Sequence, residues 1–419
     1  MISFGTKLEK YLNYLLVFLL PTQLALHFWP PTAFVFGIRI DYLAPAIYLT
    51  DVLFLTLFAT WIRGNYKNFI NLIKRNRTYI FLLILLAIVN IIFSTSVFPS
   101  IYKWIKVGEI VMFYYYLKAR KDIFNSKNML FTLYYSLLFF SLIGIIQFFL
   151  GHTLGGPLYL FGERSFNAST QGIALVDLFG RNYMRAYSTF SHPNSFAGYL
   201  GLGIIPVLFL FSKKELFKRC FGIAVICLAF LFTFSLSAFI AAILCAGLYL
   251  LLHRKVVNKK FLLLVPATFL LLSLFLPFIS SVILKNKIDL PQNLSQRVYL
   301  SSAAGVMISQ KFLTGTGLNT FIINQPRIQF LNNYQWIMQP VHNIFLLVFS
   351  EIGIFGLIIV YILMIKKNKA ALLSDNKIFY LGLLFVLVTG FTDHYWFTLQ
   401  QNMFLLVLIL SNSFRVKKW

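Results

Sequence analysis

The chain has 419 residues, of which 59% are hydrophobic and only 12% are charged, and its mean hydropathy is +0.78. A soluble protein of this length carries about twice as much charge, so the composition excludes that class. The net charge of +25 would suit a nucleic-acid-binding protein, but the Lys and Arg residues lie in short segments between apolar runs, which argues against that class.

Apolar runs of about 20 residues recur along the chain, the length that a helix needs to cross a hydrocarbon layer about 30 Å thick. We therefore predict an all-α polytopic membrane protein that forms one integral membrane domain over residues 1–419. A membrane β-barrel is not predicted, because strand-length alternation with turns is absent. The first run is predicted to be retained, since no small-residue cleavage site follows it. Twelve spans are predicted, at residues 11–29 (kinked at Pro21), 43–62, 79–97, 101–117, 129–150, 196–211, 221–234, 237–252, 261–283, 344–365, 378–392 and 397–414.

The apolar run 220–252 is too long for one crossing at about 1.5 Å per residue. We predict that it forms two short helices separated at the sequence TFSLSA, residues 233–238. The three cysteines, Cys220, Cys227 and Cys245, lie in apolar runs and are predicted to be small core residues rather than a disulfide or metal set.

Most of the 37 Lys and Arg residues fall in loops on one side of the predicted spans. The positive-inside rule places these loops, and both termini, in the cytoplasm. Two loops on the opposite side are long, at residues 151–195 and 284–343, and the larger one contains a predicted helix at 295–310. Because loops that only connect spans are usually short, these outer loops are the first place to look for function.

The outer loops carry the first candidate residues. Arg185 precedes a turn formed by His192, Pro193 and Asn194, a sequence that also suits a helix start. Arg297 is expected in the first turn of the helix at 295–310, where a cation opposes the helix dipole and needs a compensating anion. His342 and Asn343 stand directly before the span at 344–365. Taken alone they would suit a helix cap and a structural histidine.

Three further sets of polar residues lie at or within the spans. Lys103, Lys106 and Glu109 are spaced three apart and share one helical face; snorkelling of Lys103 and a mutual pair of Lys106 with Glu109 are the structural alternatives to a binding role. Asp393 and His394 lie in the short outer turn between the last two spans. Glu351 is expected about 13 Å into the bilayer from His342.

Six stretches, in the same order along nearly the whole chain, resemble the O-antigen ligase family, whose relatives include the O-antigen polymerases. They read GIRIDYLAPAIYLTDVLF, RAYSTFSHPNSFAGYL, TFSLSA, QRVYLSSAAGVMISQKFLTGTGLNTF, HNIFLLVFSEIGIFGL and TDHYWF. The sequence departs from the family pattern at Leu236, where members often carry an arginine.

The resemblance implies a C-type glycosyltransferase architecture with its active site on the outer, periplasmic face of the cytoplasmic membrane. It implies that a glycan moves from a polyprenyl-pyrophosphate carrier to an acceptor hydroxyl, on lipid A-core for a ligase or on another glycan for a polymerase. His342 matches the family's general base, and Arg185 and Arg297 match its pyrophosphate-handling arginines. Lys103 and Lys106 would supplement them. Asn343 and His192 are expected near the site, with His192 chiefly structural. Asp393 and His394 are expected either to line the site or only to form hydrogen bonds across the short turn.

The sequence also lacks two common motifs for metal and nucleotide binding. It has no D-x-D pair for a metal-bound nucleotide sugar and no P-loop for ATP, so no metal and no cofactor are expected. A transporter or flippase for lipid-linked sugars is the competing class, for which Glu351 is the one favourable residue, although no internal repeat supports it. A structural membrane subunit is a third class, but it would not require outer arginines.

Overall fold

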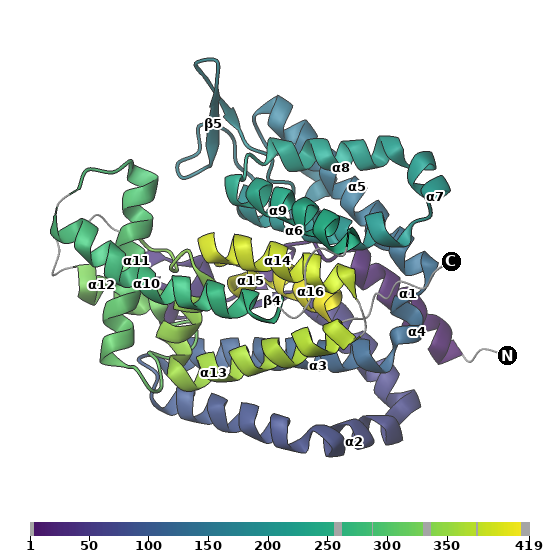
Figure 1. Ribbon diagram of the computed structural model, residues 1–419, viewed down its shortest axis with the longest axis horizontal. Helices are drawn as coiled ribbons and strands as arrows, with labels where there is room; N and C mark the ends of the chain where they lie inside the picture. Colours follow the sequence, from purple (N-terminus) through teal and green to yellow (C-terminus); the bar gives the residue numbers. More distant parts are fainter. Residues whose placement is uncertain (1–3, 255–261, 287, 330–336, 374–375, 412–419) are drawn as a thin grey trace.

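A computed structural model describes residues 4–254, 262–286, 288–329, 337–373 and 376–411. The chain is a membrane protein built mainly of helices (Figure 1). The helices are α1 Phe4–Phe18, α2 Leu49–Ile92, α3 Val97–Ala119, α4 Lys121–Phe124, α5 Lys127–Leu150, α6 Pro193–Leu210, α7 Lys213–Lys218, α8 Cys220–Phe232, α9 Leu236–His253, α10 Val265–Lys285, α11 Gln292–Gln310, α12 Phe321–Gln329, α13 Ile344–Leu373, α14 Lys377–Thr392, α15 Tyr395–Thr398 and α16 Gln400–Leu410.

Three short antiparallel pairs of strands lie outside the helical bundle. The strands are β1 Ala25–His27 with β4 Ala46–Tyr48, β2 Phe34–Val35 with β3 Ile38–Arg39, and β5 Leu175–Leu178 with β6 Arg181–Met184. Three 3₁₀ turns accompany them: η1 Pro31–Ala33, η2 Asp41–Leu43 and η3 Gly156–Phe161. The hairpin of β5 and β6 projects from the top of the molecule in Figure 1.

Six helices of the described chain are long and apolar enough to cross a membrane: α2, α5, α6, α9, α10 and the part of α13 up to Lys366. Helices α8, α14 and α16 are apolar but shorter. The predicted total of twelve spans therefore stays a prediction. The predicted division near residues 233–238 is confirmed, because α8 ends at Phe232 and α9 begins at Leu236.

Three local predictions were wrong. The first span ends at Phe18, because Pro21 cannot continue a helix, and the chain then forms β1. The second and third spans belong to one 44-residue helix, α2, bent at Asn65, whose side-chain amide bonds to the Trp61 carbonyl. Cys220 and Cys227 are exposed, and only Cys245 is buried. Of the two alternatives left open for Lys103, snorkelling is not observed, since its side chain is buried.

The centre of the bundle is formed by α6, α14 and α16, which contact one another. In Figure 1, α14 and α16 lie in the middle of the view, between α5, α8 and α9 above and α2 and α3 below. Apolar residues of these central helices belong to the largest buried cluster. Dense packing here fixes where the helices end, and several candidate site residues stand at those ends.

The chain after α11 makes a glycine turn that packs directly against α13. Gly315 has a φ of +70°, and a Cβ built on it would lie 2.3 Å from the carbonyl carbon of Glu351. The Asn90 amide of α2 donates to the carbonyl oxygens of Thr314 and Glu351, at 2.9 and 2.8 Å. The turn therefore joins α2, α11 and α13.

The mutation Gly315→Ala should destabilise the folded protein by at least about 2 kcal/mol, since it combines a positive φ with a backbone clash. We expect a shorter half-life of the monodisperse protein on heating in detergent. Gly247→Ala is the matched control, because Gly247 lies in α9 with no atom within 4 Å of its Cβ position. Equal half-lives for the two variants would contradict the proposed packing.

Candidate active site

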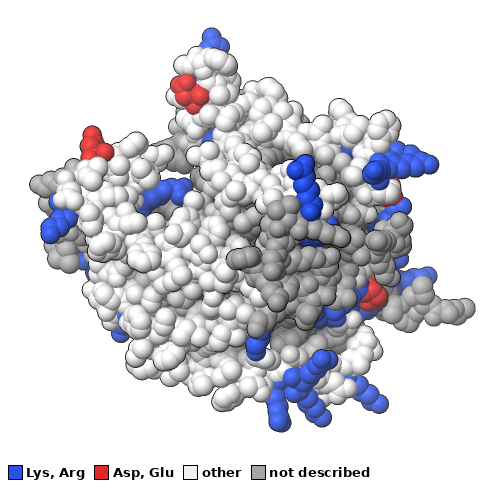
Figure 2. All heavy atoms as spheres, viewed as in Figure 1, with Lys and Arg blue, Asp and Glu red and all other residues white. Residues whose placement is uncertain are grey.

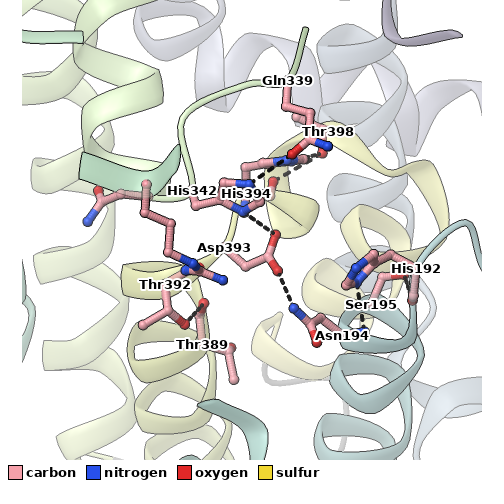
Figure 3. A network of polar contacts seen from close by, with 12 residues as sticks. His192, Asn194, Ser195, Gln339, His342, Thr389, Thr392, Asp393, His394 and Thr398 are labelled. Atoms are coloured by element: carbon pink, nitrogen blue, oxygen red, sulfur yellow. Dashed lines mark hydrogen bonds and ion pairs between the residues drawn. The ribbon is translucent and has the colours of Figure 1, made fainter. Parts of the chain in front are cut away.

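The candidate active site is organised around Asp393, in the turn between α14 and α15. Its side chain is buried. One carboxylate oxygen, Oδ2, accepts a hydrogen bond from the Asn194 amide at 2.9 Å, and the other, Oδ1, accepts one from the backbone N–H of His394 at 2.8 Å. Figure 3 shows that His342 faces the same carboxylate from the chain before α13, with Nδ1 3.8 Å from Oδ1. The ends of α6, α13 and α14 thus meet at one carboxylate.

The charge state of Asp393 follows from these neighbours. Burial by itself would raise the pKa of Asp393, but the imidazole of His342, followed by those of His394 and His192, holds it well below its usual range. Asp393 is therefore ionised at neutral pH. As a carboxylate it accepts the hydrogen bonds of the Asn194 amide and the His394 backbone N–H.

His342 lies at the partly open side of this cluster. Its side chain is 21% exposed, and Nε2 lies 3.1 Å from Oε1 of Gln339. The ring centroid of His342 is 5.2 Å from that of His394. One ring nitrogen of His342 thus faces a buried carboxylate and the other lies toward the exposed side of the cluster.

Arg185 is held from two sides between the hairpin and α6. Its Nε donates to the carbonyl of Thr233 at 2.6 Å, and Nη2 donates to Oδ1 of Asn194 at 2.7 Å. The same Asn194 side chain donates to Asp393, so it links guanidinium and carboxylate. Burial lowers the pKa of Arg185 to about 10, which leaves the group cationic at neutral pH.

Arg297 reaches the cluster from α11 and donates to the carbonyl of Thr392, next to Asp393. Because α11 begins at Gln292, Arg297 lies beyond its first turn, so the dipole argument made for it was wrong. Like Arg185, it is bonded to an uncharged oxygen. The structure therefore brings His342, Arg185 and Arg297 around one aspartate.

The other residues predicted near the site have local structural contacts. His192 caps α6 by accepting the N–H of Asn194 at 3.1 Å, and burial lowers its pKa to about 4. Burial also lowers the pKa of His394 to about 3, and its Nδ1 lies 2.8 Å from Oγ1 of Thr398. Asn343 caps α13 by accepting two N–H groups and donates to Ser273.

Lys103 and Lys106, both on α3, lie outside the cluster around Asp393. Lys106 forms ion pairs with Asp51 and, at 3.6 Å, with Glu109. Lys103 donates to the carbonyl of Thr398 at 3.4 Å. Since the Thr398 hydroxyl contacts His394, Thr398 connects Lys103 to the cluster. The two lysines line a cavity of about 380 Å³ beside the cluster.

Two groups were missed or misjudged from the sequence. Asn194 was assigned only to a helix start, yet its amide joins Arg185 to Asp393; the sequence holds no local signal for this contact. Glu351 accepts the backbone N–H of Phe321 at 3.0 Å, so it caps α12. His342, Asp393 and His394 have ligand atoms within 4.8 Å of one another, an arrangement that could hold a metal ion.

A family model described as O-antigen ligase matches residues 221–361, a segment that contains Thr233, Arg297 and His342 but not Arg185 or Asp393. No curated protein matches the chain. The match covers about a third of the chain and supports the resemblance to the O-antigen ligase family.

Proposed function

We propose that this protein is a glycosyltransferase that moves a glycan from a polyprenyl-pyrophosphate carrier to an acceptor hydroxyl at the outer face of the cytoplasmic membrane. The observation that carries the proposal is the meeting of His342, Arg185 and Arg297 around Asp393. An O-antigen ligase with lipid A-core or another surface acceptor is the primary proposal, and a polysaccharide polymerase is the alternative.

The charge distribution supports this orientation. Figure 2 shows Lys and Arg side chains gathered toward the right-hand end of the molecule, over α1, α4, α7 and the bend of α2. Basic segments of membrane proteins face the cytoplasm. The cluster around Asp393 lies at the ends of α6, α13 and α14, away from those segments, which suits an outer active site.

His342 is proposed as the general base. The acceptor oxygen forms a bond to the anomeric carbon, the bond from that carbon to the pyrophosphate oxygen breaks, and the hydroxyl proton passes to Nε2 of His342. Asp393 orients the ring through Nδ1 and stabilises the imidazolium that forms. The separation of 3.8 Å exceeds a hydrogen bond, and contacts of this kind shorten when substrate closes a site.

Arg185 and Arg297 are proposed to bind the departing pyrophosphate. A guanidinium presents a planar fork of N–H groups that matches phosphate oxygens. Each arginine is held by carbonyl or amide oxygens, so within the described residues no carboxylate pairs directly with it. Lys103 would add charge beside them. Lys106 is the weaker contributor, because Asp51 and Glu109 compensate it.

The proposed reaction is metal-independent. Both oxygens of Asp393 and Nδ1 of His394 already have partners within the protein. The two arginines supply the positive charge that a metal would otherwise bring to a leaving pyrophosphate. Glu351 was the residue that favoured a transporter. Its contact with the N–H of Phe321 gives it a helix-capping role instead, which weakens that alternative.

Replacing His342 by Ala should lower glycan transfer by about 10²–10⁴-fold while the protein still inserts into the membrane. The assay is expression in a ligase-null host, with surface glycans resolved on a gel. Wild-type protein should restore polymer attached to the lipid anchor. A ladder of lengths restored in a polymerase-null host would instead assign the polymerase reaction.

Transfer by His342→Ala at the wild-type rate would exclude the base role. A loss of wild-type transfer in EDTA would exclude metal independence.

Arg297→Lys should lower the transfer rate by at least about tenfold, because lysine keeps the charge but cannot make the bidentate contact. Arg181→Lys is the matched control, since Arg181 is exposed on β6. The comparison uses initial rates with a lipid-linked donor and purified protein in nanodiscs. A wild-type rate for Arg297→Lys would leave Arg297 with a structural role only.

The cap of α6 needs a neutral His192, because its Nδ1 accepts the N–H of Asn194, and this gives a pH dependence of stability. With a folded pKa of about 4 against an ordinary value of about 6.5, the unfolded chain binds the extra proton between these limits. Stability contributed by neutral His192 is therefore present above pH 6.5 and lost as the pH falls toward 4, by about 2 kcal/mol at pH 5. His192→Asn keeps a capping acceptor, so its heat inactivation should depend less on pH. An unchanged pH dependence would contradict the assignment.

A further inference from the structure

A second site adjoins the cluster around Asp393, in the cavity of about 380 Å³ that Lys103 and Lys106 line. Its volume lies within the usual range of ligand pockets, about 300–1,000 Å³. Much of its wall comes from the segment between Pro21 and α2, where the sequence predicted the end of one span and the start of another. That segment folds instead into the short strands and turns around β1 and β4.

The cavity has an excess of cations on its lining. Among the described residues that line it, Asp41 is the single carboxylate, against Arg39, Arg164 and Lys103. Lys106 lines it too, but Asp51 and Glu109 compensate its charge. Asp41 is shared by two guanidiniums, since it lies 3.1 Å from Arg164 and 3.8 Å from Arg39. One carboxylate cannot neutralise two arginines, so positive charge remains at the rim.

At the buried part of the cavity wall, Lys103 also lacks a compensating carboxylate among the described residues. Lys103 is buried, and within the described part of the chain no carboxylate lies within 4.0 Å of its Nζ; its near partners are the Thr398 carbonyl and the Met403 sulfur. The carboxylate of Glu351 interacts electrostatically with the Lys103 ammonium group but lies too far from it to form an ion pair. A buried ammonium group with neutral partners is costly unless an anion approaches it.

Part of the remaining wall is aromatic. His27 stacks on Trp29 at 5.9 Å between ring centroids, and the Arg39 guanidinium covers Trp29 at 4.5 Å. Tyr48 and Tyr102 lie beside Lys106, at 5.4 and 5.8 Å from its Nζ. Flat rings with polar edges suit the apolar face of a sugar ring together with its hydroxyl groups.

The cavity and the proposed catalytic cluster touch through two residues. Tyr42 lines the cavity and meets His394 edge to face, with ring centroids 5.6 Å apart. Thr398 lines it too and bonds to His394. The ring of His394 is thus the single side chain between the cavity wall at Tyr42 and His342, so the cavity adjoins the proposed catalytic cluster.

We propose that this cavity binds a sugar residue that carries a carboxylate or phosphate group, within a glycan used by the transfer reaction. The inference rests on the proposed function. The carrier's pyrophosphate is the less suitable occupant, because it needs no aromatic wall and would face Asp41, whereas Arg185 and Arg297 offer it a site with no direct carboxylate partner.

Binding to the full chain in nanodiscs tests the proposal by calorimetry, with two matched probe pairs. One pair is a glucuronate-containing trisaccharide and its carboxyl-reduced twin, and the other is glucose 6-phosphate and glucose. At least one acidic probe should bind about tenfold or more tightly than its neutral twin. Arg39→Gln and Arg164→Gln should remove that difference. Both side chains are about half exposed or more, at 63% and 49%, so the variants should fold. Arg181→Gln, on the distant hairpin, should keep the difference.

Three results would overturn the proposal: equal binding of acidic and neutral probes, insensitivity to Arg39→Gln and Arg164→Gln, or displacement of the acidic probe by farnesyl pyrophosphate in a manner that depends on Arg39. Transfer assays separate this failure from that of the proposed function. Wild-type transfer without acidic preference contradicts only the cavity's role, whereas acidic binding without any transfer contradicts only the reaction. Donors and acceptors that each carry the acidic sugar then show which glycan the cavity receives.

Discussion

The buried carboxylate of Asp393 is the interaction on which the meeting of α6, α13 and α14 depends. An ionised carboxylate removed from water costs several kcal/mol unless hydrogen bonds and opposite charge compensate it. Its partners come from the start of α6, the chain before α13 and the turn after α14. A shift of any of these three helices would leave the buried charge unsatisfied, so helix packing and site geometry stabilise each other.

The cations of the protein fall into two kinds according to their partners. Arg120 pairs with Glu9, and Lys106 with Asp51 and Glu109, so these charges are cancelled within the fold. Arg185 and Arg297 are held in place by carbonyl and amide oxygens. Neutral partners fix a guanidinium without lowering its attraction for an anion. This difference separates side chains that hold helices together from those available to a substrate.

Features that depend on local chemistry could be predicted from the sequence. The break between α8 and α9 follows from the length of an apolar run and a few polar residues, and the helix at α11 follows from its periodicity. The contacts of Asn194 with Arg185 and Asp393 join distant segments and leave no pattern of spacing. Position within an element was also missed where tertiary packing decides it, as in the early end of α1 and the continuous course of α2 through its basic segment. Glu351 favoured a transporter because its depth in the bilayer could be predicted from the sequence, whereas its partner, the N–H of Phe321, could not.

The neutral state of His394 connects the two adjoining sites. Its ring lies between Tyr42 on the cavity side and His342 on the cluster side. The hydroxyl of Thr398 hydrogen-bonds to this ring, and the backbone carbonyl of Thr398 accepts a hydrogen bond from Lys103. A protonated ring there would add a cation between Lys103 and His342 and would compete with His342 for Asp393. Because burial lowers the pKa of His394 to about 3, the ring stays uncharged at neutral pH. The carboxylate of Asp393 is then left to the one imidazole that lies on the exposed side of the cluster.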